Sequence, residues 1–490
     1  MSDSVISAVV VPRGPLTLRE VVLAGPGTPV AAELGSVALR SASVAVGVEA
    51  AVEAVAHPDA RRQPLSTMVS VVVILGLCLF SGEGYCRVLT RLWPLLSRFN
   101  PALLMRGPVT GPGLSKARTR VPPAVMRAVF EAGAAREIPE PDRGQRVFGF
   151  LVTGTDGTVL DLAASDANRE RFATPSGGKF PQARAVTLVA CGTRRILGAE
   201  IDSCAVSEQV LWDRLAGRLR PGTLNLADRN FFAMNRWRIA AATGAQLIWR
   251  VKNGQKSVPA RVLQVLADGS CLVRLRESNA MLYARRKAIG NPKAARLEDL
   301  TARMVEFMVT VTDQSGRSTR SRFRVMTTLL DPLAYPASEI AACYAERWQV
   351  EITYKLIKSG LRGGDRQLRG QAPDLAEQEI WGVLTVYNLL VEHAVRTAVE
   401  LGIDPDEISF IHVLRVLRDH LIPVPACPDC GAPATLHPEE DLIAAIASGP
   451  RNRPDRDRTA PRTVKDRQTQ HTRTVTYMID ILESNLPRTT

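Results

Sequence analysis

The sequence predicts a mixed α/β protein in which a helical module precedes a sheet with helices on its faces, and a β-rich insertion interrupts the sheet. Three observations predict this arrangement. Residues 30–136 show helical periodicity, residues 145–252 alternate between β-rich runs and helical patterns, and residues 253–330 return to short strands separated by turns. A chain of 490 residues is too long for one ordinary core, so we expect about two to four domains.

The N-terminal part is expected to be helical and basic. Residues 1–29 are rich in Pro, Gly and small residues and predict a flexible arm. The segment YCRVLTRLWPLLSRF places Arg87 and Arg91 on one helical face, and RGPVTGPGLSKARTRVPP is a loop dense in cations and turn residues. A short helix follows from Pro123. We therefore expect residues 30–136 to form a helical module with a basic surface.

The most apolar run, MVSVVVILGLCLF from Met68 to Phe80, is shorter than the roughly 20 residues that a membrane-spanning helix needs. It also lies inside the chain, so it is not a signal peptide. We expect a buried helix and no membrane partner. The eight cysteines are scattered, which is typical of reduced thiols in a cytoplasmic protein rather than of a disulfide framework.

The middle of the chain predicts the sheet. Its order is three strands, a helix, a strand, a helix and a strand, which indicates a mixed α/β sheet with helices on both faces. The expected strands are Val147–Thr153, Ala185–Cys191, Arg195–Ile201, a run TLNLAD that ends at Asp228, and Gln246–Lys252, with helices over Ser207–Leu219 and Phe232–Thr243.

The insertion at 253–330 contains four β-rich runs, ARVLQVLADGSCLVRL, MLYARR, MVEFMVTVTDQSGRS and RFRVMTTLL, with turn signals DGS and QSGRS. At about 75 residues it exceeds an ordinary connection, which suggests a task of its own. Residues 331–425 are expected to complete the core with helices, the first of them capped by Ser338. The last segment, 426–490, is Arg-rich and Pro-punctuated and predicts a basic, flexible tail.

The charge balance favours a polyanionic partner. The net charge is +13 and the pI is about 9.7, which favours nucleic acid or an anionic surface. The alternative is a basic protein that is merely soluble and has no such partner.

The stretch CYAERWQVEITYKLIKSG predicts a site. With about 100° per residue in one regular helix, Tyr344, Arg347, Glu351 and Lys358 fall within an arc of about 60°. A solvated face with an i,i+4 pair between Arg347 and Glu351 is the simpler interpretation. It does not explain a lone carboxylate among cations over two further turns.

Two more carboxylates are candidates for the same site. Enzymes that cut phosphodiesters often hold two divalent metals about 4 Å apart with carboxylates from separate elements. Asp228 ends an apolar strand, where α/β sheets place ligands, although an N-cap is its alternative role. Asp156 lies in VTGTDGTVLDL, where Asp-Gly is also a hairpin signal, and Asp161 competes for the same role.

A family resemblance rests on the segments TDGTVLDL, LADRNFF and QLIWRVK and on Tyr344, Arg347, Glu351 and Lys358. The chain resembles the insertion sequence 4 family of DDE transposases, whose Tyr, Arg, Glu, Lys signature has gaps of two, three and six residues, as here. The resemblance covers most of residues 30–425, including a region similar to that family's N-terminal domain. One departure is Asn230, where members commonly have Gly; Asn tolerates the left-handed conformation that Gly supplies.

The resemblance implies an RNase H-like catalytic core interrupted by a β-strand insertion. It implies that Asp156, Asp228 and Glu351 are the catalytic triad and ligate two Mg²⁺ ions, for which Mn²⁺ would substitute. Tyr344 and the two cations of the signature, Arg347 and Lys358, would contact DNA phosphates beside the scissile bond.

The expected function is that of a transposase that binds insertion-sequence ends, cleaves the DNA and joins the 3′ ends to target DNA. Its partners would be double-stranded DNA, both the terminal inverted repeats and the target, and a second copy of itself on that DNA. Its place would be the bacterial cytoplasm, at the nucleoid when bound to DNA. The alternatives are a retired, non-catalytic DNA-binding descendant and an RNase H-like nuclease that only hydrolyses.

Two weaker signals remain open. The family often holds a flipped base on an aromatic side chain. Here Trp249 borders the insertion and Tyr283 and Phe307 lie within it, but a Trp in an apolar strand is more typical of a core. Cys427 and Cys430 make half of a zinc site, and a thiol pair in a turn is the simpler interpretation.

Overall fold

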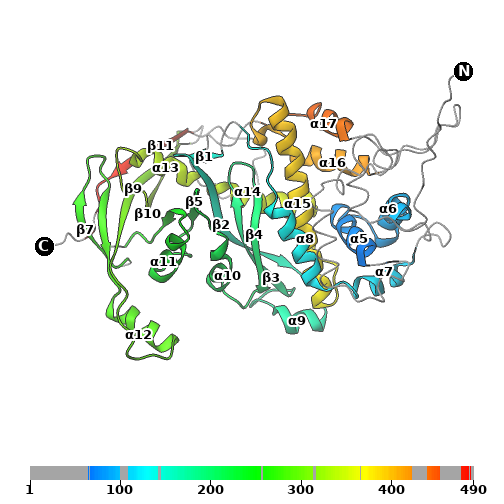
Figure 1. Ribbon diagram of the computed structural model, residues 1–490, viewed down its shortest axis with the longest axis horizontal. Helices are drawn as coiled ribbons and strands as arrows, with labels where there is room; N and C mark the ends of the chain where they lie inside the picture. The colour runs from blue at the N-terminus through cyan, green and yellow to red at the C-terminus, as the bar shows by residue number, and fades with distance from the viewer. Residues whose placement is uncertain are drawn as a thin grey trace, which may run out of the picture.

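The computed structural model describes residues 65, 67–99, 109–141, 145–254, 258–312, 316–364, 366–421, 439–452, 476–484 and 486. A large sheet occupies one side of the molecule, and a group of helices from both ends of the chain occupies the other (Figure 1). The expected N-terminal arm, the thiol pair Cys427 and Cys430 and most of the expected tail lie outside the described residues.

The N-terminal module is helical, with α5 (Thr67–Leu79), α6 (Tyr85–Phe99), α7 (Gly111–Arg118) and α8 (Pro123–Ala135). Helix α5 carries the apolar run of the sequence, and its described side chains are buried as expected. It packs against α15 (Pro373–Leu401), a long helix buried over most of its length. Of the helices described, none combines the length and the apolar character needed to cross a membrane.

Helix α15 joins the N-terminal module to the C-terminal part of the chain. Besides α5, it contacts α8, α16 (Phe410–His420) and α17 (Glu439–Ala447), so all these helices share one hydrophobic core. The helices therefore form one body beside the sheet, with α15 at its centre (Figure 1).

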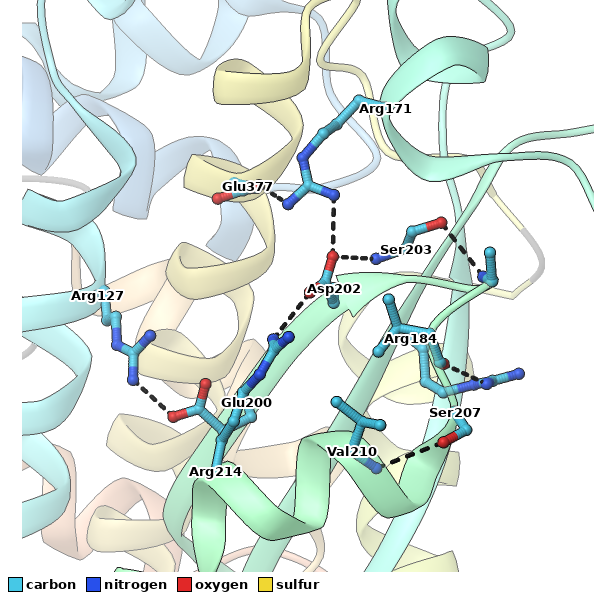
Figure 2. Close-up of polar contacts among 12 residues, drawn as sticks. Arg127, Arg171, Arg184, Glu200, Asp202, Ser203, Ser207, Val210, Arg214 and Glu377 are labelled. Carbon is cyan, nitrogen blue, oxygen red and sulfur yellow. Dashed lines mark hydrogen bonds and ion pairs between the residues drawn. The ribbon is translucent and has the colours of Figure 1, made fainter. Parts of the chain in front are cut away.

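Ion pairs hold this helical body against the edge strand of the sheet (Figure 2). On that strand, Glu200 accepts a hydrogen bond from Arg127 of α8 at 2.6 Å, and Asp202 accepts one from Arg171 at 2.9 Å. Arg171 also reaches Glu377 of α15 at 3.3 Å. These charged contacts supplement the apolar packing between the two parts.

Five strands of the sheet form the expected core: β2 (Phe150–Asp161), β3 (Gln182–Ala190), β4 (Arg195–Ser203), β5 (Thr223–Ala227) and β6 (Gln246–Arg250). Their spatial order is β4-β3-β2-β5-β6. The first three strands in the chain pair antiparallel, and β5 and β6 run parallel to β2. Helices α9 (Asp166–Phe172), α10 (Glu208–Leu215) and α11 (Met234–Ala242) connect them. This topology is that of the RNase H-like fold, which confirms the predicted fold class.

The insertion extends this sheet instead of forming a separate one. It contributes β7 (Ala260–Val265), β8 (Cys271–Leu275), β9 (Leu300–Thr312) and β10 (Ser318–Thr327), and β10 pairs antiparallel with β6. The core and the insertion therefore form one continuous sheet, in the order β6-β10-β9-β8-β7.

One run expected to be a strand is a helix. MLYARR lies within α12 (Asn279–Ala288), which projects from the sheet (Figure 1) and has no buried residue. Ser278 caps the helix by accepting from the Met281 N–H at 3.2 Å, and Glu277 accepts from Arg285 Nε at 2.7 Å. Alanine, leucine and arginine favour helices, and the Ser278 cap stabilises the start of this one, so the segment is helical.

The expectation of an unstructured tail is wrong for two segments. Within 426–490 the structure describes α17 and a last strand, β11 (Thr476–Leu482), which pairs antiparallel with β9 from Thr312 to Glu306. Strand β8 pairs only with the first part of β9, so β11 continues the same edge. The run TYMIDIL carries a local β pattern that the average composition of the tail concealed.

Candidate active site

Asp156 and Asp228 stand side by side on neighbouring parallel strands. The register of β2 and β5 pairs Thr155 with Ala227, so each aspartate is the next residue along its strand. Neighbouring strands are about 4.8 Å apart, and residues at the same level of a parallel pair face the same side. The two carboxylates therefore share one face of the sheet, at the C-terminal end of β5.

Asp156 is not a hairpin residue, because β2 runs without a break through the Asp-Gly pair. Its competitor Asp161 lies five residues further along the same strand, about 17 Å away at the usual rise per residue. The Asp161 carboxylate accepts a hydrogen bond from Gln182 at 2.8 Å. The structure thus places Asp156, and not Asp161, beside Asp228.

The sequence predicted one regular helix for the signature segment, and this prediction is wrong. It forms α13 (Ala337–Ala345) and α14 (Trp348–Lys355), followed by a π-helical turn, Leu356–Leu361. At the junction the Glu346 N–H bonds to the Cys343 carbonyl at 3.0 Å and the Arg347 N–H to the Tyr344 carbonyl at 3.2 Å. Such i→i−3 bonds overwind the chain, and the π-helical turn underwinds it. The single arc of about 60° therefore does not hold across the segment.

Helix α14 approaches β2 closely because Gly154 has no side chain. A Cβ at this position would lie 2.4 Å from Val350 Cγ2 and 3.2 Å from Cys191 Sγ. Val350 and Cys191 are both fully buried, so neither has room to retreat. This close approach brings Arg347 and Glu351 of the helix over the strand that carries Asp156.

We expect Gly154→Ala to destabilise the protein by about 1–3 kcal/mol, the usual cost of overpacking a core. The added methyl group would push α14 away from β2. Urea unfolding measures the loss, and Val350→Ala in the same chain should restore part of it. A Gly154→Ala protein as stable as the wild type would show that the helix is not in contact with the strand here.

Arg347 connects two of the predicted catalytic carboxylates. Its Nη1 donates to Asp156 Oδ2 at 2.9 Å, and its Nη2 donates to Glu351 Oε1 at 2.7 Å. One guanidinium thus spans the carboxylate of β2 and the carboxylate of α14. Arg347, which the family resemblance implies as a phosphate contact, therefore lies at the site and is bonded to two carboxylates in this structure.

Burial shifts the ionisation of Asp156. Burial is the largest influence on Asp156 and raises the pKa of its carboxyl to about 6, against an ordinary 3.8. Arg347 and the Gly157 N–H lower this pKa, while the negative charges of Glu351 and Glu208 raise it further. Because burial and the two negative charges outweigh Arg347 and the Gly157 N–H, the Asp156 carboxyl ionises less readily than a free one.

Asp228 has fewer partners. Its Oδ1 is buried without a hydrogen bond in the described structure, and the nearest cation is Arg250 at 3.6 Å. Tyr344 lies close to both Asp228 and Arg347, because both charges act on the pKa of its hydroxyl, which burial raises. Tyr344 is only 6% exposed, so its ring packs in the protein and Phe323 lies against it.

Lys358 is the last of the three residues expected to contact DNA phosphates. It lies in the π-helical turn after α14 and is half-buried. Its carbonyl accepts a hydrogen bond from the Gly364 N–H at 3.0 Å. The wider turn moves Lys358 relative to its place on a regular helix.

Of the three aromatic candidates for a flipped base, two are built into the core. Trp249 is fully buried and donates its indole N–H to Asn225 at 3.0 Å. Phe307 is buried and stacks on Phe323. Tyr283 on α12 is 72% exposed.

Glu208, whose charge acts on Asp156, was not a candidate from the sequence. A glutamate in the first turn of a helix is common and carries no signal of its own. Only the approach of α10 to β2 reveals it, and no local pattern encodes that contact.

Comparison with known proteins assigns the chain to a family. The sequence profile of the family described as "Transposase DDE domain" matches residues 150–389, and that of "Insertion element 4 transposase N-terminal" matches residues 38–131. The chain is 26% identical over 420 residues to "Transposase InsG for insertion sequence element IS4" of Escherichia coli (strain K12), covering 83% of this chain and 86% of that protein. This chain belongs to the IS4 family of DDE transposases. The resemblance found in the signature residues is confirmed.

A solved structure is also similar to this transposase, the "Cryo-EM structure of piggyBac transposase synaptic complex with hairpin DNA (SNHP)". The similarity covers 93% of this chain and 88% of that chain, with a TM-score of 0.41 and 9% sequence identity. A TM-score of this size supports no conclusion about function.

DDE transposases use divalent metal, and the donor set at this site is of the right kind. Mg²⁺ prefers carboxylate oxygens, and Asp156, Asp228 and Glu351 supply them from three elements. Over the described ranges, no three His, Cys, Asp or Glu side chains lie close enough to hold one metal ion. Arg347 occupies the space between Asp156 and Glu351, and Asp228 Oδ1 accepts no hydrogen bond in the described structure and lies 3.6 Å from Arg250 Nη1.

Proposed function

We propose that this DDE transposase binds the ends of an insertion sequence, cleaves the DNA there and joins the 3′ ends to target DNA. The observation that carries the proposal is the alignment of Asp156 with Asp228 on parallel strands, with Glu351 linked to Asp156 through Arg347. Three carboxylates from separate elements are what phosphoryl transfer with divalent metals needs.

The Asp156, Asp228 and Glu351 carboxylates would hold the metal. The proposed cofactor is a pair of Mg²⁺ ions, with Mn²⁺ as a substitute. When bound, the metal supplies Lewis acidity, which activates the attacking hydroxyl and stabilises the leaving oxygen. The protein holds Asp156 and Asp228 at a fixed spacing through the β2–β5 register, and α14 carries Glu351 opposite them.

Arg347 has two tasks in this proposal. In the structure it forms ion pairs with Asp156 and Glu351. When metal and DNA bind, its guanidinium would leave at least one of these carboxylates and contact a phosphate, for which its planar fork is suited. Lys358 would contact a further phosphate as a point charge, and Tyr344, which is buried beside Arg347, would support this contact.

The proposed partners are double-stranded DNA, as terminal inverted repeats and as target, and a second copy of the transposase on that DNA. The net charge of +13 supports binding to DNA backbone. The proposed place of action is the bacterial cytoplasm, at the nucleoid when the protein is bound to DNA.

The proposal is tested with duplexes that carry the DNA flanking the coding region. Purified transposase and Mg²⁺ should nick such a duplex at the end of the element, and Asp228→Asn should not. Cleavage by the wild type that is equal with and without divalent metal would contradict the metal-dependent reaction.

We expect Lys358→Ala to weaken binding to the end duplex and to reduce the salt dependence of binding by about one counterion, the effect of losing one phosphate contact. Fluorescence anisotropy at several salt concentrations measures both quantities. Lys293→Ala, an exposed lysine of the insertion, is the matched control. An unchanged salt slope in Lys358→Ala would remove Lys358 from the set of phosphate contacts.

A further inference from the structure

Glu208 has a fixed position at the start of α10. Ser207 caps this helix by accepting a hydrogen bond from the Val210 N–H at 3.4 Å (Figure 2). Just before the cap, Arg184 of β3 donates to the Val206 carbonyl. The cap orders the first turn of α10, the bond from Arg184 ties the residue before the cap to β3, and Glu208 follows the cap directly.

The Glu208 carboxylate lies over the backbone next to Asp156. A Cβ at Gly157 would lie 2.5 Å from Glu208 Oε1 and 2.7 Å from its Cδ, so this approach exists only because residue 157 is glycine. The Gly157 N–H donates to Asp156 Oδ1 at 2.8 Å. Gly157 thus donates its amide N–H to the Asp156 carboxylate, and its missing side chain leaves room for Glu208 on the other face of β2.

The same carboxylate contacts the turn that begins at Asp228. Asn230 Nδ2 donates to Glu208 Oε2 at 2.6 Å. Gln209, the next residue of α10, donates to Asn230 Oδ1 at 2.9 Å and to the Asn230 carbonyl at 3.1 Å. The turn itself is closed by a hydrogen bond from the Phe231 N–H to the Asp228 carbonyl at 3.0 Å. The first turn of α10 is therefore hydrogen-bonded to Asn230, which lies two residues after Asp228 in this turn.

We propose that Glu208, through its hydrogen bond with Asn230, is a positioning residue that fixes Asp228 relative to Asp156. It contacts both of the elements that carry these aspartates, and no other described side chain is shown to bond to Asn230 except its neighbour Gln209. Asn230, a departure from the family pattern, thereby gains a defined role. The inference rests on the proposed function of the two aspartates.

A helix-dipole role alone does not account for these contacts. A first-turn carboxylate stabilises a helix through its charge and needs no partner outside the helix. Asp166 is such a residue: it is an exposed acid in the first turn of α9. Glu208 instead has one oxygen on Asn230 and the other over Gly157. Asp166→Ala is therefore the matched control for Glu208→Ala.

The test measures single-turnover cleavage of the end duplex at saturating DNA and Mg²⁺. Glu208→Ala and Asn230→Ala should each slow cleavage by about 10- to 100-fold, as is usual when a residue that orients a site ligand is lost. The double variant should be no slower than the slower single variant, because both break one bond. Glu208→Gln, whose amide oxygen still accepts from Asn230, should stay near the wild-type rate, as should Asp166→Ala.

Two readouts separate positioning from a merely structural role. The thermal midpoint and the affinity for the end duplex, both measured without metal, should stay at wild-type values in Asn230→Ala, because Asn230 is exposed. Mn²⁺ should restore part of the lost rate, since Mg²⁺ is the ion that demands near-ideal octahedral geometry.

The outcomes distinguish this inference from the proposed function. Wild-type cleavage by Glu208→Ala, or by Asn230→Ala if the former does not fold, would overturn the positioning role while leaving the proposed function intact. So would a Glu208→Gln protein as slow as Glu208→Ala, because the charge and not the bond would then matter. If the wild type does not cleave, or if Asp228→Asn still does, the proposed function itself fails.

Discussion

Replacing Glu351 with Gln is expected to slow strand cleavage by at least about 1,000-fold, because a metal ligand carries several kcal/mol of transition-state stabilisation. The change keeps the shape of the side chain and still offers Arg347 an acceptor oxygen at the position of Oε1. The affinity for the end duplex should therefore stay close to that of the wild type. Gel-based cleavage and anisotropy on the same DNA measure the two effects.

The control for this variant is Glu339→Gln, an exposed glutamate in the first turn of α13. It removes a charge from the neighbouring helix without touching the three carboxylates, and it should cleave at the wild-type rate. Cleavage by Glu351→Gln at the rate of this control would remove Glu351 from the triad.

Asp156→Asn is expected to abolish cleavage and yet stabilise the metal-free protein at neutral pH. Burial raises the pKa of Asp156 to about 6 from 3.8, so the ionised carboxylate is less favourable in the folded chain than in the unfolded one. A shift of this size corresponds to about 3 kcal/mol, and asparagine avoids that cost. We expect a gain of about 2–3 kcal/mol in the free energy of unfolding at pH 7.5 in the presence of EDTA.

The sign of the pH dependence is fixed by the direction of the pKa shift. Below pH 3.8 Asp156 is protonated in both states and the gain vanishes, whereas between 3.8 and about 6 the folded wild type retains a proton that the unfolded chain releases. The stability of the wild type therefore falls relative to Asp156→Asn as the pH rises through this window, and the difference is constant above it.

Urea unfolding across the pH range measures this difference, and Asp161→Asn is the control on the same strand. If the difference in the free energy of unfolding did not change with pH, or if Asp161→Asn gained as much stability, the ionised Asp156 carboxylate would not destabilise the folded protein. The expected pattern is that of an active-site carboxylate kept for function at the expense of stability.

Much of the fold was predictable because its signals are local. The run MVSVVVILGLCLF predicted a buried helix, and the alternation of strands and helices between 145 and 252 predicted the sheet. Asp228 was found because its strand is apolar and ends at a carboxylate. The chance that Asp156 was a hairpin residue could be removed only by the structure, because the continuity of β2 depends on pairing with strands far away in the chain.

The features that the sequence did not reveal depend on tertiary contacts or on small departures from regular geometry. The break between α13 and α14 follows from two i→i−3 hydrogen bonds, which no residue at the junction announces. Strand β11 exists because β9 offers it a free stretch beyond β8. Glu208 reaches the site only because Gly157, 51 residues earlier in the chain, leaves it space.

The most direct test is a structure of the wild-type transposase bound to its end duplex with Mn²⁺, in which anomalous scattering locates the metal. The account predicts metal density in contact with oxygens of Asp156, Asp228 and Glu351, with the Arg347 guanidinium moved from at least one carboxylate toward a DNA phosphate. Metal density elsewhere, or an Arg347 that still bridges Asp156 and Glu351 in the presence of metal and DNA, would contradict it.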